Sequence, residues 1–172
     1  MKTKKELRKR RSKGQALLEF TLSAFPMIFL LISVEEMARG MWIYTTLAHA
    51  VKEGTRYSIV HGADCAIADS SCQITLGQVA TRIQQAGLGL DASQFNVVLQ
   101  TSGSTHNCTP LRSCLSNSST WPASPDNNVG LPITVSGTYP FSSALAMFIP
   151  QTGSVKFGSL TFSSASQEEI RY

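Results

Sequence analysis

Hydrophobic positions form one long, nearly uninterrupted run near the start of the chain. Residues 15–34 carry a single charged side chain, Glu19, among mostly apolar residues. A helix of this length spans about 30 Å at 1.5 Å per residue, which matches the hydrocarbon core of a bilayer. Two acids, Glu35 and Glu36, directly follow the run, and no small-residue cleavage site of a secretory signal occurs there. The pattern therefore predicts a retained transmembrane helix over residues 15–34.

A helical pattern continues beyond the apolar run. Residues 35–60 contain no proline, and apolar side chains recur at steps of three or four. Glu35 and Arg39 also stand in the order that favours an ion pair between helical turns. The predicted stripe consists of Met37, Met41, Tyr44, Ala48, Val51 and Thr55. We therefore expect the helix to continue outside the membrane through residue 60, with this stripe packed against the rest of the chain.

A proline interrupts the predicted membrane helix. Pro26 has no backbone N–H, so the carbonyl of Leu22 loses its helical hydrogen-bond partner. Prolines inside helices are a common cause of bends. We therefore expect the helix to bend at Pro26.

Shorter periodic segments predict an α+β domain over residues 61–172. Residues 76–86 have helical periodicity and end at Gly87. Alternating or β-branched residues predict three strands, and an apolar stretch before Pro150 predicts a short helix. The strands are expected at residues 95–101, 131–139 and 155–163, and the short helix at residues 140–148. Because three strands cannot bury both faces, we expect one face of a small antiparallel sheet to pack on the long helix.

The segment between the first two predicted strands lacks periodicity. Residues 102–130 are rich in Ser, Thr, Asn, Pro and Gly. A structureless loop of this length is unusual in a compact domain, so a functional, disulfide-tethered or mobile loop is expected. Trp121 within it is either an adhesive contact or an anchor of the loop.

All four cysteines lie in the predicted outer domain, as expected for an oxidising compartment. Four cysteines permit three connectivities, and free thiols are also compatible with the sequence. Proximity in sequence favours two small loops. The favoured pairs are Cys65 with Cys72 and Cys108 with Cys114. Neither spacing is the C-x-x-C of zinc or thiol-redox sites.

Charge is divided unevenly along the chain. Residues 1–13 hold eight Lys or Arg and one Glu, for +7, whereas the remainder holds seven Lys or Arg and ten Asp or Glu, for −3. The body therefore offers no basic surface for nucleic acid. A basic run directly before an apolar helix favours a cytoplasmic N-terminus, by the positive-inside rule. We expect a single-pass membrane protein with residues 61–172 outside the cytoplasm.

No arrangement of side chains suggests an active site or a cofactor. His49, His61 and His106 lack ligand spacing to a cysteine or a carboxylate. The many serines of residues 101–124 are not framed by a G-x-S-x-G motif. We therefore expect a protein that is not an enzyme and holds neither a metal nor a cofactor.

Gly14, Gln15 and Glu19 form the most distinctive combination in the sequence. A glycine just before the helix offers an unhindered bond to a peptidase at the membrane surface, and a cut between Gly14 and Gln15 would remove the +7 leader. A carboxylate inside a membrane helix costs roughly 2.5–3.5 kcal/mol on insertion scales, so it usually has a partner. We expect Glu19 to neutralise the new α-amine at Gln15 of a neighbouring subunit. In the alternative interpretation, Glu19 only extends to the nearby interface.

These residues also open a longer resemblance. The segment G-Q-A-L-L-E-F matches the type IV prepilin pattern, and about the first 60 residues closely resemble the N-terminal region of TadE-like pseudopilins of the tight-adherence (Tad) pilus system. That region contains G-x-A-x-x-E-F, a proline within the apolar helix and a later E-G-x-R-Y segment. The matching positions are Gly14, Ala16, Glu19, Phe20, Pro26, Ala50, Glu53, Gly54, Arg56 and Tyr57. One departure is the pair Glu35-Glu36, where the family more usually has one acid.

The resemblance implies a pilin-like fold and a minor pilin or pseudopilin. Residues 1–14 would be a leader that prepilin peptidase removes after Gly14, and Glu19 would serve processing and assembly. The implied partners are prepilin peptidase, other pilin or pseudopilin subunits, the assembly platform and membrane lipid. The implied location is the bacterial inner membrane or a surface pilus, and the tip, the shaft and the assembly machine are equally compatible positions.

The later part of the motif carries its own expectations. Glycine in a helix costs about 1 kcal/mol relative to alanine, so we expect another group to approach Gly54 closely. Packing of the helix on its own sheet is favoured over a contact with a partner. Glu53 and Arg56 are spaced for a surface ion pair.

A second class of function is compatible with the same sequence. A single-pass anchored binding protein would keep its N-terminus uncut at Gly14, and its residues 61–172 would recognise a ligand or surface without a partner helix. An anchored hydrolase has less support, because the sequence shows no acid/base or nucleophile arrangement.

Overall fold

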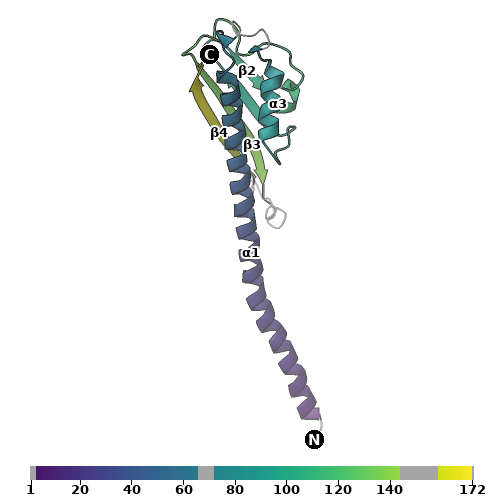
Figure 1. The fold of residues 1–172 in the computed structure, drawn as a ribbon. Coiled ribbons are helices and arrows are strands. Elements are labelled where there is room, and N and C mark those ends of the chain that lie inside the picture. The colour runs from purple at the N-terminus through teal and green to yellow at the C-terminus, as the bar shows by residue number, and fades with distance from the viewer. Residues whose placement is uncertain (1–2, 66–71, 144–158, 172) are drawn as a thin grey trace. The chain divides into compact units, whose positions relative to one another are not determined.

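The computed structural model describes residues 3–65, 72–143 and 159–171 and has an α+β fold (Figure 1). Its contacts divide the chain into two units, Met1–Arg39 and Gly40–Tyr172. The elements are α1 (Thr3–Ile59), α3 (Leu76–Ala86), β1 (Asn96–Gln100), β2 (Thr105–Cys108), the 3-10 helix η2 (Leu111–Cys114), β3 (Pro132–Ser142) and β4 (Ser159–Glu169). The predicted combination of a long N-terminal helix with a small antiparallel sheet is confirmed.

The first unit consists of the N-terminal part of α1. The helix includes Thr3, in the basic N-terminal segment, and contains Pro26 without ending there. Most side chains of residues 14–39 are exposed, including the large apolar ones. The hydroxyls of Thr21 and Ser23 donate to the carbonyls of Leu18 and Glu19 at 3.0 Å, so these polar groups are satisfied inside the helix, as an apolar solvent requires. The bend at Pro26 stays a prediction.

The second unit contains a four-stranded antiparallel sheet in the order β2-β1-β3-β4. The longest ladder joins β3 to β4, from Pro132 opposite Glu169 to Ser142 opposite Ser159. Alternate residues of β3 from Ile133 to Phe141 are buried, whereas the intervening residues up to Thr138 are only half-buried. The sheet therefore buries one face, which packs against α1 and α3 (Figure 1).

Two of the predicted strands are confirmed, whereas the third strand and the short helix need correction. The strands expected at residues 95–101 and 131–139 correspond to β1 and β3. Because β3 continues to Ser142 and Ser143 is not helical, the helix expected at residues 140–148 is wrong over its first four residues, and residues 144–148 lie outside the described part of the chain.

The last strand and the long loop differ more strongly from expectation. β4 runs from Ser159 to Glu169 rather than over residues 155–163, of which 155–158 lie outside the described residues. Its second half is Ser-rich and acidic and lacks an apolar alternation, so hydrogen bonds to β3 rather than its own pattern define it. Residues 102–130, expected to be a loop, contain the polar edge strand β2 and the 3-10 helix η2.

The predicted helix over residues 76–86 is confirmed as α3. The Thr75 hydroxyl accepts from the Gln78 N–H at 3.3 Å, and the Gln78 side chain accepts from the Thr75 N–H at 2.9 Å. This reciprocal capping box satisfies two amides at the start of the helix. The buried face of α3 consists of Leu76, Gly77, Val79, Ala80 and Ile83.

The apolar stripe predicted on α1 is only partly correct. Val51 and Thr55 are buried, but Met41 and Tyr44 are exposed in the second unit, and Met37 is exposed in the first. The buried face within the second unit consists of Gly40, Leu47, Ala50, Val51, Gly54, Thr55, Ser58 and Ile59. Many of these residues are small, because close approach of neighbouring elements rather than hydrophobicity alone determines which face is covered.

The structure also contains both favoured disulfides, Cys65–Cys72 and Cys108–Cys114. Trp121 is fully buried in the main core, so the interpretation of Trp121 as an anchor is confirmed and its role as an adhesive contact is wrong. Its backbone N–H donates to the carbonyl of Ile74 at 3.0 Å, which ties the long segment to the start of α3.

Candidate processing and assembly segment

The residues around the predicted cut lie on an exposed part of α1. Gly14 and Gln15 are both exposed, and a Cβ at Gly14 would have no heavy atom within 4 Å outside its own helix neighbourhood. The glycine therefore has no packing role among the described residues.

Glu19 lies one helical turn after Gln15, and its carboxylate is exposed within the described chain. The Gln15 side-chain amide donates to Glu19 Oε1 at 3.4 Å, longer than the usual 2.7–3.2 Å of such bonds. In the untrimmed chain the Gln15 nitrogen is an ordinary backbone amide. The predicted charge partner of Glu19, an α-amine at Gln15, can therefore exist only after a cut behind Gly14.

The motif residues Gly54 and Tyr57 pack α1 against α3. A Cβ at Gly54 would overlap the Ile83 side chain, with Ile83 Cδ1 at 2.8 Å. The Arg82 guanidinium carbon lies 5.0 Å from the centroid of the Tyr57 ring, a cation–π geometry. The close approach expected at Gly54 is present, but the approaching element is α3 rather than the sheet.

The sheet makes its own close approach to α1 at a different glycine. A Cβ at Gly137 of β3 would lie 2.7 Å from Val51 Cγ2 and 3.2 Å from Leu47 Cδ1. Sequence reasoning missed this position, although a glycine inside an alternating strand is a known signal of close backbone approach.

Glu53 and Arg56 do not form the ion pair that their spacing allows. Within the described part of the chain, Arg39 Nη2 forms a salt bridge with Glu36 Oε2 at 3.2 Å, so Arg39 pairs with Glu36 rather than with the expected Glu35. Arg56 is exposed and Glu53 is half-buried. Both charges are therefore available to another molecule.

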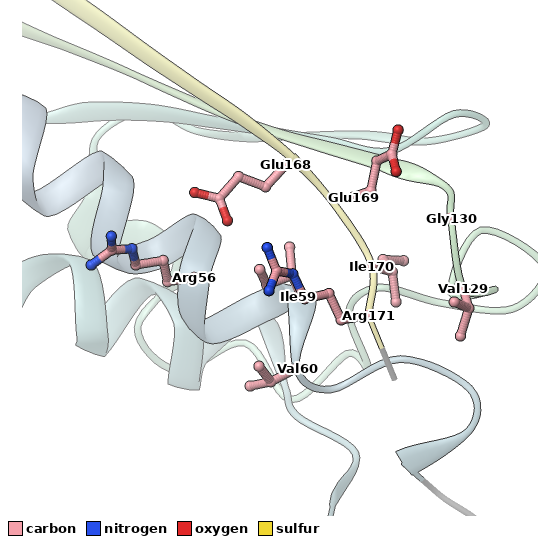
Figure 2. A pocket seen from close by; sticks show the side chains of 9 residues that line it. All are labelled: Arg56, Ile59, Val60, Val129, Gly130, Glu168, Glu169, Ile170 and Arg171. Atoms are coloured by element: carbon pink, nitrogen blue, oxygen red, sulfur yellow. The ribbon is translucent and has the colours of Figure 1, made fainter.

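Arg56 lines an open groove of about 950 Å³ where α1 ends (Figure 2). Ile59, Val60, Val129 and Ile170 provide apolar walls, and the remaining lining residues are Gly130, Glu168, Glu169 and Arg171. Figure 2 shows Glu168 directed toward the α1 side of β4 and Glu169 toward the other side. The Arg171 N–H donates to the carbonyl of Ile59 at 3.0 Å, so the chain after β4 is fixed to the end of α1.

The described residues contain no cluster of three His, Cys, Asp or Glu side chains that could hold a metal. One carboxylate has a perturbed pKa. The Ser93 N–H donates to Asp91 at 2.9 Å and the Ser93 hydroxyl at 2.7 Å, and these bonds lower the pKa of Asp91 below its ordinary value. This pattern is that of an Asx-turn, which stabilises the loop before β1.

Comparison with known proteins gives a match over the same helix. Residues 14–56 match the family model TadE, described as TadE-like protein. The chain carries a TadE-like N-terminal region. This region begins at Gly14, includes Glu19, and ends at Arg56 beside Tyr57. A search of curated proteins and a search of solved structures each found no match.

The TadE-like region indicates a protein that is associated with Tad pilus systems and with their pilus components. Within the described chain, one helix is long and apolar enough to cross a membrane, and its most apolar stretch is not buried by the rest of the protein. This helix fits a single-pass membrane anchor.

Proposed function

We propose that this protein is a minor pilin or pseudopilin of a tight-adherence pilus. Prepilin peptidase removes residues 1–14, and the trimmed chain joins a pilus or its initiation complex through the N-terminal half of α1. The observation that carries the proposal is the TadE-like match that begins at Gly14, the residue before the predicted cut. The role is structural, with neither an enzymatic activity nor a cofactor.

Trimming and assembly are linked through charge. The leader contributes +7 and holds the N-terminus in the cytoplasm. Its removal creates an α-amine at Gln15, about 6 Å along the helix from Glu19 at 1.5 Å per residue. In a staggered assembly, Glu19 of one subunit pairs with this amine on the next. This pair neutralises the Glu19 carboxylate, which otherwise costs roughly 2.5–3.5 kcal/mol to insert into lipid as an unpaired charge.

The mass of the mature protein tests the processing step. In cells with an active tight-adherence system, the wild-type chain is expected to begin at Gln15, and Gly14→Leu is expected to retain the leader because its side chain hinders the bond. Thr21→Leu is the matched control, since it adds an aliphatic side chain at another exposed position of the same helix. An intact leader on the wild-type chain would refute the proposal and favour an anchored binding protein.

The assembly step needs a variant that leaves trimming and insertion intact. Glu19→Gln is expected to reach the membrane but to lose incorporation into pili, measured by the amount of subunit in sheared filaments or in crosslinked complexes. Glu35→Gln, which removes an exposed carboxylate just beyond the apolar run, is the control and should assemble normally. Wild-type incorporation of Glu19→Gln would show that Glu19 only extends to the interface.

A further inference from the structure

β4 forms one outer edge of the sheet and lies at its left side in Figure 1. Within the described part of the chain, only β3 pairs with it, through a ladder of 11 residues without a bulge. Residues 159–167 of this strand contain neither a proline nor a charged side chain. Proteins usually prevent pairing at a sheet edge with short strands, prolines, lysines or bulges. Since β4 has none of these features, its outer side can accept another strand.

The opposite edge of the sheet is short. β2 has only 4 residues, Thr105–Cys108, and its last residue is tied by a disulfide to Cys114 of η2. A short edge strand offers few backbone groups to a partner. The long edge at β4 is therefore the stronger candidate for a partner strand.

Hydrogen bonds at the end of the ladder show which backbone groups of β4 point outward. The Ile170 N–H donates to the carbonyl of Leu131 at 3.0 Å, so Ile170 faces the β3 side. In an antiparallel pair, the backbone groups of successive residues alternate between the two sides of the strand. Odd-numbered residues, Ala165 and Glu169 among them, therefore point their N–H and C=O groups away from β3. Glu169 stands opposite Pro132, which has no N–H to donate, in agreement with this alternation.

Side chains give this edge two different ends. Near its start, Leu160 is 60% exposed. The ring of Phe162 lies 6.1 Å from that of Tyr44 on α1, which is 48% exposed. Near its end, Glu168 and Glu169 follow each other, and Glu169 is exposed. The edge is therefore apolar at the start of β4 and acidic at its end.

This polarity disfavours pairing of β4 with the same strand of a second copy. Antiparallel pairing over the full length of Ser159–Glu169 would place Leu160 of one copy opposite Glu168 of the other, an apolar residue against a charge. Parallel pairing in register would place the two glutamates beside those of the second copy, and like charges on neighbouring strands are destabilising. The occupant that fits this edge is a strand of a different sequence.

We propose that the outer side of β4 binds an extended segment of another pilus subunit, which adds to the sheet as an antiparallel strand. The inference deepens the proposed function and rests on it for the identity of the partner. Backbone hydrogen bonds supply the affinity, as in other complexes formed by strand addition. Antiparallel pairing continues the pattern of the sheet and is slightly more stable per residue than parallel pairing.

The side chains of the edge specify the chemistry of this segment. Charge complementarity requires a basic side chain near its start, opposite Glu169. The exposed apolar groups require an aliphatic or aromatic side chain near its end, beside Phe162 and Leu160. The segment therefore runs from a basic residue to an apolar one.

A synthetic peptide with this pattern tests the edge. It consists of alternating threonine and valine and is blocked at both ends, with a lysine first and a leucine near its end. The control peptide has the same composition in reverse order. Binding of each labelled peptide to the full chain in detergent micelles is followed by fluorescence anisotropy. The peptide with lysine first is expected to bind, and the reversed peptide is expected to bind about tenfold more weakly, because both of its end contacts are mismatched.

A pair of substitutions at Ala165 tests the backbone contact. Ala165→Pro removes an N–H that points away from β3, and edge strands tolerate proline at such positions. It is expected to weaken peptide binding about tenfold, because a hydrogen bond is lost and the ring obstructs the incoming strand. Ala165→Thr keeps the N–H and is expected to bind the peptide like the wild type. Trp121 emission in a Trp42→Phe background shows whether each variant keeps the fold of the second unit.

A charge exchange at Glu169 tests the direction of the added strand without a proline. Glu169→Lys is expected to weaken binding of the peptide that has lysine first and to favour a peptide that has glutamate in that place. Glu35→Lys makes the same charge change at an exposed residue outside the second unit and is expected to alter neither affinity.

Three results would overturn the strand addition. The first is the absence of peptide binding, or equal binding of the two peptide orders. The second is binding that Ala165→Pro leaves unchanged in a folded protein. The third is self-association of the full chain that Ala165→Pro abolishes, which would assign the edge to a second copy.

Trimming of the leader in cells reports on the proposed function separately. Normal trimming without peptide binding would refute the contact at β4 alone. An untrimmed leader with directional peptide binding would refute the proposed function and, with it, the identity of the partner as a pilus subunit.

Discussion

The contact between Gly54 and Ile83 predicts an unusual sign for a substitution in a helix. Gly54→Ala places a methyl group where the inner atoms of the Ile83 side chain lie. Ile83 is fully buried and β-branched, so its χ1 angle cannot adjust freely. Relief therefore requires α1 and α3 to separate. We expect Gly54→Ala to destabilise the second unit even though alanine is the better helix former.

The magnitude follows from two opposing contributions. Overpacking of a well-packed core typically costs about 1–3 kcal/mol. Replacement of glycine by alanine inside a helix contributes about 1 kcal/mol of stability. The net effect at Gly54 is a destabilisation of roughly 0–2 kcal/mol. At Gly40, the added Cβ would lie 3.6 Å from Phe162 and 3.9 Å from Phe141, which are ordinary van der Waals contacts. Gly40→Ala is therefore expected to raise the free energy of unfolding by about 1 kcal/mol.

The difference between the two alanine variants isolates the overpacking. Urea unfolding in detergent micelles, followed by Trp121 emission in a Trp42→Phe background, measures both free energies of unfolding. The free energy of unfolding of Gly40→Ala is expected to exceed that of Gly54→Ala by about 1–3 kcal/mol. With Ile83→Ala present, Gly54→Ala should no longer be destabilising. Equal stabilisation by both alanines in the presence of Ile83 would refute the close approach of α3 to α1.

Two further predictions concern the core beneath the long segment of residues 102–130. Trp121→Ala should cost about 3–5 kcal/mol because it removes the largest fully buried side chain. Trp121→Phe should cost much less stability, because Trp121 Nε1 has no hydrogen-bond partner among the described residues and none is lost. Thermal unfolding compares the two variants, and an equal loss of stability in both would contradict this prediction. The double variant Cys108→Ala/Cys114→Ala opens a loop with a sequence separation of 6 and should lower the free energy of unfolding by about 2 kcal/mol. Urea unfolding under non-reducing conditions measures that loss, and an unchanged midpoint would show that packing alone holds η2 against the sheet.

Much of the candidate site could be predicted because its signals are local. Gly14, Glu19 and the apolar run lie within one helix, where spacing along the chain defines spacing in the structure. The capping box at Thr75 and the short disulfide loops are equally local. By contrast, the Ser-rich half of β4 has no pattern of its own, and its position follows from the ladder to β3.

The sequence by itself determined the anchor-like helix, the basic charge of its first residues and the α+β class of the rest, since each depends on composition or short-range periodicity. Only the tertiary structure decided which face of α1 is buried, because several faces carry apolar residues and the small residues opposite Ile83 and Gly137 select one. It also decided that Trp121 is buried while Trp42, Leu88 and Leu160 are exposed. Burial depends on long-range contacts, and hydrophobicity along the chain does not specify them.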